Sequence, residues 1–319
     1  MQQSRPRKPR FTRVAGSARI SLTARDLRIL SEVARHRFTQ SHHLARLLGG
    51  SVQHVVRRLG KLYHAGLLDR PRAQLLLRES IAPSLLYCLS PDGRKVLETR
   101  QSEAIPPIPR LRGAACALSL SHALRVTDIL VAIQHAAAQG RTAFLSLPSQ
   151  AGSMLAEGTS QEWRMRWRVR QERGQAAWII PDGAFALQSE EGTPTFFMLE
   201  ADRGTMPVAR SKPGQSSFER KIRLYKETRG QGALWSRFGI PAFRVLIVAE
   251  SRQRLATIQR ATARQFKRGD SEMFLFAVAS DVMSGNSIDA WMTCGGAGRC
   301  LLPHPEGVVH SADRNETPA

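Results

Sequence analysis

Apolar residues in the first part of the chain recur at three- and four-residue steps, which is the spacing of amphipathic helices. A first helix is predicted after Thr23, a good N-cap whose capping-box partner Asp26 follows three residues later. Its apolar positions continue to about Phe38. A second, shorter helix is predicted within residues 40–48, where leucines form a narrow apolar stripe.

A third helix follows the pair Gly49-Gly50, because glycine does not easily continue a helix and Ser51 is a good N-cap. This helix is expected to stop at Gly66. Six of its apolar residues recur at helical spacing and are expected to be buried on one face: Val52, Val55, Val56, Leu59, Leu62 and Tyr63. The opposite face and its flanks carry polar and basic residues: Gln53, His54, Arg57, Arg58, Lys61 and His64.

A short helix, a glycine turn and a basic second helix are typical of a helix-turn-helix that places its second helix in the major groove of duplex DNA. The alternative is an ordinary solvated surface helix, which can be equally basic. Two strand-like segments, 67–77 and 84–89, follow the third helix, with Arg70, Arg72 and Arg78 near their connection. Three helices and a basic hairpin predict a winged helix, with the hairpin arginines on phosphates.

The second half of the chain alternates helical and strand-like segments, which predicts a mixed α/β sheet with helices on its faces. Helices are expected at 114–138, 217–228 and 252–266, and strands at 142–147, 163–169, 176–187, 195–200, 243–248 and 273–279. The predicted organisation is a disordered basic arm (1–20), a winged helix (21–100), a proline-rich linker (101–113), an α/β domain (114–282) and a partly irregular tail (283–319).

The charge balance favours a polyanionic partner, because the net charge is +21 and the pI is near 11.3. Residues 1–100 hold 20 Lys and Arg against 6 Asp and Glu, so two thirds of the excess lies in this segment, which contains the predicted helix-turn-helix. No apolar run approaches the roughly 20 residues of a membrane span, and the N-terminus has no signal-peptide core. We therefore expect a cytoplasmic protein whose partner is double-stranded DNA.

Acidic residues at the ends of two successive predicted strands are the strongest candidates for chemistry. Asp182 lies in Ile180-Pro181-Asp182-Gly183, and Glu200 and Asp202 follow at the end of the next strand. Their carboxylates could bind Mg²⁺ for phosphodiester chemistry, with Lys221 approaching from the following helix. The alternative is that Asp182 belongs to a turn and the other two acids are solvated.

The order of these residues resembles the PD-(D/E)xK nuclease superfamily, which implies Asp182, Glu200, Asp202 and Lys221 as catalytic candidates and the three acids as metal ligands. One departure affects activity: the lysine of that motif should come two residues after Glu200, where this chain has Asp202. Without that cation, orientation of the attacking water and charge stabilisation in the transition state would depend on Lys221.

Short motifs along residues 22–250 also resemble the replication-relaxation family of plasmid and mobile-element proteins. They include Val56-x-Arg58-Leu59-x-x-Leu62, His122-x-Leu124-x-Val126-x-Asp128, Pro181-Asp182-Gly183, Leu199-Glu200-x-Asp202-Arg203-Gly204-Thr205 and Lys221-Ile222-x-x-Tyr225. The resemblance implies a winged helix joined to a nuclease-like α/β domain. It also implies an accessory role in plasmid replication, DNA relaxation or mobilisation, alongside a relaxase or replication initiator.

Two alternative functions follow from the same residues: a Mg²⁺-dependent nicking endonuclease that uses Asp182 and Glu200, or a winged-helix transcription regulator. A homodimer that reads two half-sites is also compatible with the predicted winged helix.

Further histidines and cysteines give weaker signals. His122 is expected to be a hydrogen-bonded core residue, with a catalytic base as the alternative. The residues Cys294, Cys300, His304 and His310 match no common zinc module.

Overall fold

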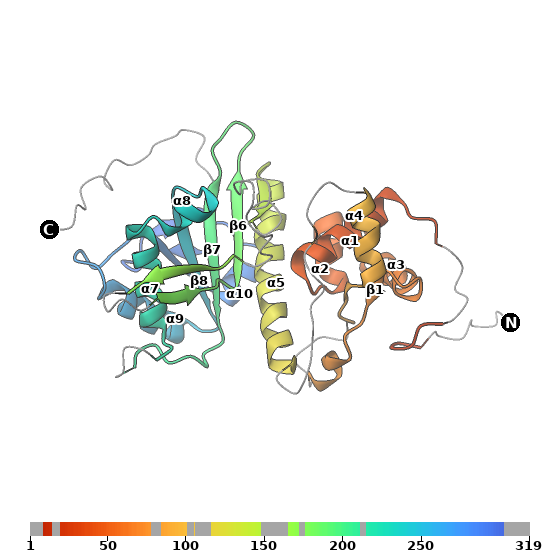
Figure 1. The fold of residues 1–319 in the computed structure, drawn as a ribbon, viewed down its shortest axis with the longest axis horizontal. Coiled ribbons are helices and arrows are strands. Elements are labelled where there is room, and N and C mark those ends of the chain that lie inside the picture. The colour runs from red at the N-terminus through yellow and green to blue at the C-terminus, as the bar shows by residue number, and fades with distance from the viewer. Residues whose placement is uncertain are drawn as a thin grey trace.

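The computed structural model describes residues 9–14, 20–77, 84–100, 105, 116–147, 165–171, 176–210 and 215–302. These residues adopt an α/β fold, as the sequence predicts. Figure 1 shows the N-terminal helices on one side, a sheet on the other and one long helix, α5 (Cys116–Gln139), standing between them.

The first three helices are α1 (Ala24–His36), α2 (Ser41–Leu48) and α3 (Val52–His64). Their starts follow the predicted caps. Thr23 and Asp26 form the capping box of α1, and Ser51 accepts a hydrogen bond from the N–H of His54 at the start of α3.

The segment after α3 differs from the predicted hairpin. Strand β1 (Leu68–Asp69) pairs with β2 (Cys88–Leu89) over two residues only, and a 3-10 helix, η1 (Arg72–Leu76), replaces the rest of the predicted strand 67–77. The physical reason is local. The side chain of Gln74 in η1 takes the place of a strand partner, because its amide accepts from the N–H of Leu86 and donates to the carbonyl of Leu86. Helix α4 (Pro91–Arg100) completes this part.

A seven-stranded mixed sheet forms the C-terminal part, in the order β11-β10-β9-β8-β7-β6-β3. Its strands are β3 (Ala143–Ser146), β6 (Gly183–Gln188), β7 (Thr195–Asp202), β8 (Phe243–Ala249), β9 (Phe274–Val278), β10 (Trp291–Met292) and β11 (Gly298–Arg299). β7, β8 and β9 run parallel, and the other neighbours are antiparallel. β8 and β9 are almost entirely buried because helices cover both faces.

One face of the sheet packs against helices α7 (Phe218–Gly230), α8 (Ala233–Phe238) and α9 (Arg252–Ala263). The other face packs against α5 and α10 (Ala279–Met283). The core therefore has two apolar layers, one on each side of the sheet.

Two predicted boundaries in this part are wrong. The segment 176–187 is not one strand, because it breaks at Pro181-Asp182 into β5 (Ala176–Ile179) and β6. β5 pairs with β4 (Trp167–Arg170) in a separate two-stranded ribbon. The predicted tail does not begin at residue 283, since β10 and β11 extend the sheet and Trp291 is buried.

Helix α5 also packs against the N-terminal helices. Leu120 and Leu124 of α5 form an apolar cluster with Phe38, Leu86 and Cys88. The predicted linker 101–113 lies outside the described residues except for Ile105, which is buried in the N-terminal core.

Part of the predicted basic arm is also ordered against this core. Arg13 donates hydrogen bonds to the carbonyl oxygens of Tyr63 and Leu68, and the N–H of Val14 donates to His64. In the described part of the chain, no helix has both the length and the apolar character needed to cross a membrane.

The buried carboxylate of Asp26 is expected to stabilise the N-terminal helices. It accepts hydrogen bonds from the N–H and hydroxyl of Thr23 and pairs with the Arg58 guanidinium. Asp26→Ala would leave these donors without their acceptor and is expected to lower the free energy of unfolding by about 2–4 kcal/mol. Urea unfolding followed by circular dichroism measures this change. The control Asp92→Ala removes an exposed α4 carboxylate and should cost under about 1 kcal/mol; equal losses would contradict the assignment.

Candidate functional site

The acidic residues predicted to form a site lie where β6 begins and β7 ends. Gly183 of β6 pairs with Leu199 of β7, so Asp182 and Glu200 stand opposite each other one step beyond this pair. Asp202 follows on the same side of β7 as Glu200, because residues two apart in a strand share a face. The antiparallel pairing of β6 and β7 thus brings the three acids to one edge of the sheet.

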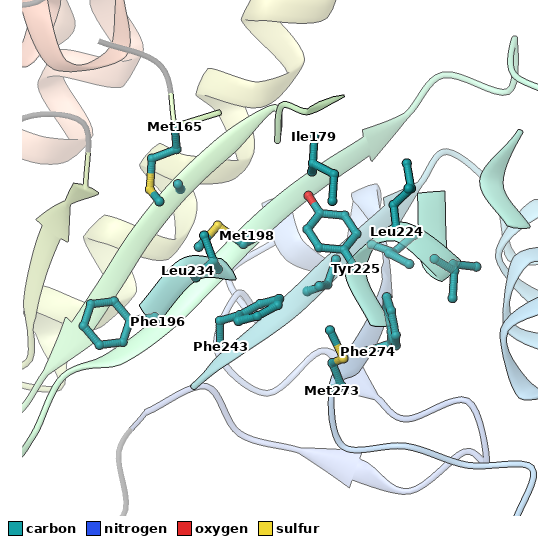
Figure 2. Close-up of a cluster of buried hydrophobic side chains, with 14 of the residues drawn as sticks. Met165, Ile179, Phe196, Met198, Leu224, Tyr225, Leu234, Phe243, Met273 and Phe274 are labelled. Carbon is teal, nitrogen blue, oxygen red and sulfur yellow. The ribbon is translucent and has the colours of Figure 1, made fainter. Parts of the chain in front are cut away.

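Glu200 is completely enclosed, although it is a charged residue type. Its Oε1 accepts a hydrogen bond of 2.6 Å from the Tyr225 hydroxyl, and its Oε2 forms an ion pair with Lys221. Both partners come from α7, four residues apart on one helix face. Figure 2 shows Tyr225 within the apolar cluster on this side of the sheet, between Ile179 and Phe274.

The buried surroundings shift the pKa values of this group. Burial raises the pKa of Glu200 to about 7, although the Lys221 charge acts in the opposite direction. Burial also raises the pKa of Tyr225 well above its usual value, and the nearby carboxylate adds to this effect. For Lys221, burial lowers the pKa, but the charges of Glu200 and Asp182 outweigh it and the net shift is upward.

Asp182 is held by α5 and by the backbone of β7. Its Oδ1 lies 2.9 Å from Nε2 of His122, and its Oδ2 accepts a hydrogen bond of 2.9 Å from the N–H of Ala201. Burial would raise the pKa of Asp182, but the His122 hydrogen bond and the charges of Lys221 and His122 bring it below its usual value. His122 is therefore hydrogen-bonded, as expected, and its partner is a candidate site residue. Its Nδ1 is buried and has no hydrogen-bond partner.

Asp202 has a cationic partner that the sequence reasoning missed. Nε and Nη2 of Arg254, on α9, lie 2.6 Å and 3.2 Å from the two carboxylate oxygens of Asp202. Nη2 also donates to the carbonyl of Met206. Arg254 is 52 residues from Asp202 in the sequence, and only the parallel pairing of β7 with β8, followed by α9, places the two together.

The carboxylates of the three acids are all engaged by protein partners in this arrangement. All six of their carboxylate oxygens have a protein partner: Lys221, Tyr225, His122, the Ala201 N–H or Arg254. A divalent cation would have to share these oxygens with their present partners, and several of them would have to converge on one point. Within the described part of the chain, the three acids are also not among the groups whose ligand atoms all lie within 4.8 Å of one another. The metal role of Asp182, Glu200 and Asp202 therefore stays a prediction.

The one such group among the described residues is His42, His43 and Asp128, at the contact of α2 with α5. Nδ1 of His43 accepts the N–H of Gln40, so its proton is on Nε2 and donates to Asp128 at 2.7 Å. A neutral imidazole in this state has no lone pair left for a metal. The arrangement is thus a hydrogen-bonded contact between helices.

The group Cys294, Cys300, His304 and His310 is only partly described, because His304 and His310 lie outside the described residues. Cys300 is exposed. The Cys294 thiol donates to Asp270, and burial raises its pKa to about 11.

The exposed face of helix α3 differs in part from the predicted one. Val55, Leu59, Leu62 and Tyr63 are buried as expected, whereas Val52 and Val56 are 44% and 47% exposed because they lie on the flanks of that stripe. Arg58 reaches back to Asp26, and His64 is covered by residues 13 and 14 of the arm. The exposed residues of α3 are Val52, Gln53, His54, Val56, Arg57 and Lys61.

The arginines of the predicted wing differ from one another in their surroundings. Arg70 lies over the rings of Tyr63 and Tyr87, at 4.0 Å and 5.0 Å from their centroids, and donates to the Tyr87 hydroxyl. Arg72 is exposed at the start of η1. Arg78 lies outside the described residues.

The raised pKa of Glu200 predicts a pH dependence of stability. The unfolded chain ionises near the usual pKa of 4.5, whereas the folded chain keeps the proton up to about pH 7. The contribution of Glu200 to stability is therefore full below pH 4.5 and is lost as the pH rises toward 7. Glu200→Gln cannot ionise, so its free energy of unfolding should fall less than that of the wild type between about pH 5 and pH 8.

Urea unfolding at the two pH values measures this difference. Glu98→Gln, at an exposed position of α4, is the control and should follow the wild type. The same pH dependence in wild type and Glu200→Gln would contradict the prediction.

Neither the curated proteins nor the solved structures give a match. The family model for replication-relaxation proteins matches residues 30–242, which include α3 and the positions of Asp182, Glu200, Asp202 and Lys221. Because this match covers about two thirds of the sequence, the chain belongs to the replication-relaxation family.

Proposed function

We propose that this protein is a DNA-binding accessory factor in the replication or relaxation of plasmids or other mobile elements, and that α3 is its recognition helix. The observation that carries the proposal is the exposed face of α3. Three elements support it: a turn of two glycines with positive φ before α3, the Ser51 cap, and the complete absence of Asp and Glu from Val52–His64. A helix without carboxylates can approach phosphates without repulsion.

The exposed residues of α3 fit the two tasks of a recognition helix. Arg57 and Lys61 lie one turn apart and can bind phosphates or guanine edges. Gln53 and His54, in the first turn, can donate to base edges, and exposed valines suit contact with thymine methyl groups. Arg58, His64 and Arg70 have internal partners, so their predicted DNA contacts carry less of the proposal than Arg57 and Lys61.

The element order also supports the winged-helix interpretation, since α1, α2 and α3 precede the short β1–β2 pair. The exposed Arg72 of η1 is the described wing residue best placed to reach a phosphate. A relaxase or a replication initiator is the proposed partner, because the family description names replication and relaxation together.

Salt-dependent binding of a labelled duplex to the full chain tests the role of α3. Arg57→Ala and Lys61→Ala should each weaken binding and reduce the slope of log affinity against log salt by about 0.9, the share of one phosphate contact. Lys95→Ala on α4 is the matched control, because its side chain is 77% exposed and it removes the same charge from the same part of the protein.

Fluorescence anisotropy over a range of salt concentrations gives both quantities. The proposal would be contradicted by a wild-type slope of log affinity against log salt near zero. Equal slopes in wild type, Arg57→Ala and Lys95→Ala would also contradict it.

A Mg²⁺-dependent nuclease is the second candidate, because the ends of β6 and β7 bring together Asp182, Glu200 and Lys221. We expect no nicking, since the carboxylates are already engaged by Lys221, His122 and Arg254. A supercoiled plasmid incubated with Mg²⁺ or Mn²⁺ should stay supercoiled at a protein concentration that binds it fully. Nicking by the wild type that is lost in both Asp182→Ala and Glu200→Ala would overturn this expectation and establish the nuclease.

A further inference from the structure

The ribbon of β4 and β5 has one face packed on the protein and one face open to solvent. Along β4 and its preceding residue, buried and exposed positions alternate, and β5 continues the same alternation. The exposed positions define what we term the ribbon face: Arg166, Arg168, Arg170, Ala176, Trp178 and Ile180.

The inner side of the ribbon is firmly attached to the α7 and α8 layer. Trp167 is buried, and its indole N–H donates to the Thr228 hydroxyl at 2.8 Å. Figure 2 shows Ile179 beside Tyr225, and Met165 belongs to the same apolar cluster. The side chain of Gln231 accepts from the N–H of Arg170 and donates to its carbonyl, at 3.0 Å and 2.7 Å. The ribbon is therefore a fixed support for whatever its outer side carries.

The ribbon face combines an exposed indole with guanidinium groups. Trp178 is 46% exposed, and the adjacent Ile180 is 45% exposed. Arg168 is the cross-strand partner of Trp178. The guanidinium carbons of Arg166 and Arg168 lie 5.0 Å and 5.3 Å from the centre of the Trp178 ring system. An indole with arginines above it offers planar surfaces on which a flat group can stack.

The charge of the ribbon face has a single sign. The described strands, residues 165–170 and 176–180, contain three arginines and no Asp or Glu. Neither Arg168 nor Arg170 is paired with a carboxylate in the ion pairs found among the described residues. Such a surface is complementary to a phosphate chain.

We propose that the ribbon face binds single-stranded DNA, with unpaired bases stacked on Trp178 and the phosphate backbone along Arg168 and Arg170. Single-stranded DNA is the occupant that uses both features at once. In a duplex the base faces are already stacked on one another, so only an unpaired base can use the exposed indole. This surface is separate from α3 and does not depend on the proposed role of that helix.

Binding of a labelled thymine homopolymer to the full-length protein tests the proposal. Trp178→Ala should weaken binding about 5- to 100-fold, the range expected for loss of one stacked base, whereas Trp178→Phe should keep most of the affinity. Trp235→Ala is the matched control, because Trp235 is a 62% exposed tryptophan on α8 and its loss should leave the affinity unchanged.

A second variant tests the phosphate contacts. Arg168→Ala should lower the salt slope of single-strand binding by about 0.7. The same variants measured with a duplex should bind like the wild type, while Arg57→Ala should weaken duplex binding and leave single-strand binding unchanged. Failure of the α3 proposal and failure of this one are thus distinguishable.

Three results would overturn the proposal. The first is wild-type single-strand affinity in both Trp178→Ala and Arg168→Ala. The second is an equal loss in Trp178→Ala and Trp235→Ala. The third is an equal loss of single-strand and duplex binding in Trp178→Ala, which would identify the ribbon face as a general phosphate-binding surface. Thermal melting followed by circular dichroism verifies that each variant is folded.

Discussion

The double burial of α5 is the constraint on which the rest of the structure depends. A helix with apolar residues around most of its circumference needs cover on more than one side. The sheet covers one side of α5 through Ile129 and Ile133, and the N-terminal part covers another, where Phe38 and Leu86 pack against Leu120 and Leu124. Neither part of the protein can move away without exposing an apolar surface of this shared helix.

Polar contacts fix the register of α5 on both sides. The Thr127 hydroxyl lies 3.1 Å from the carbonyl of Phe38, and Asp128 accepts from His43 of α2. On the sheet side, His122 contacts Asp182 at the start of β6. A slide of one helical turn would leave these polar groups buried without partners, which costs more free energy than the contacts contribute when they are made. The exposed face of α3 is therefore held in one orientation relative to the acidic edge of the sheet.

The parts of the fold that could be predicted from the sequence depend on contacts between near neighbours. Thr23 and Asp26 are three residues apart, and the apolar strands β8 and β9 are continuous runs. The wrong predictions concern segments whose structure depends on contacts that no local sequence pattern reveals. The predicted strand 67–77 is wrong because the Gln74 side chain forms hydrogen bonds with the N–H and the carbonyl of Leu86, twelve residues away.

The exposed face of α3 shows the same limit. Helical spacing placed Val52 and Val56 with the buried residues, but spacing alone does not say how wide the covered stripe is. His64 was expected on the open face, and it is buried because the N-terminal arm lies over it. Both differences depend on which neighbouring segments cover the helix.

The sequence predicts which acids lie together at the candidate site, but it does not predict the full set of residues that pair with them. Asp182, Glu200 and Lys221 were expected to lie together from the order of elements, and the antiparallel pairing of β6 and β7 brings the two acids opposite each other. Tyr225 and Arg254 were not expected to take part. The sequence signals for Tyr225 are its place in the motif Lys221-Ile222-x-x-Tyr225 and its spacing of four from Lys221, which places both on one helix face.

The cations explain how three acids can share one sheet edge. Three clustered carboxylates repel one another unless positive charges offset them. In the PD-(D/E)xK pattern a lysine would follow Glu200 at position 202, whereas here that position is Asp202 and its charge is offset by Arg254 of α9. The cation for Glu200 comes instead from Lys221 of α7. In this chain the positive charge lies on the helices above the strand, where Lys221 and Arg254 form ion pairs with Glu200 and Asp202, and this favours a structural acidic cluster over one that is open to a divalent ion.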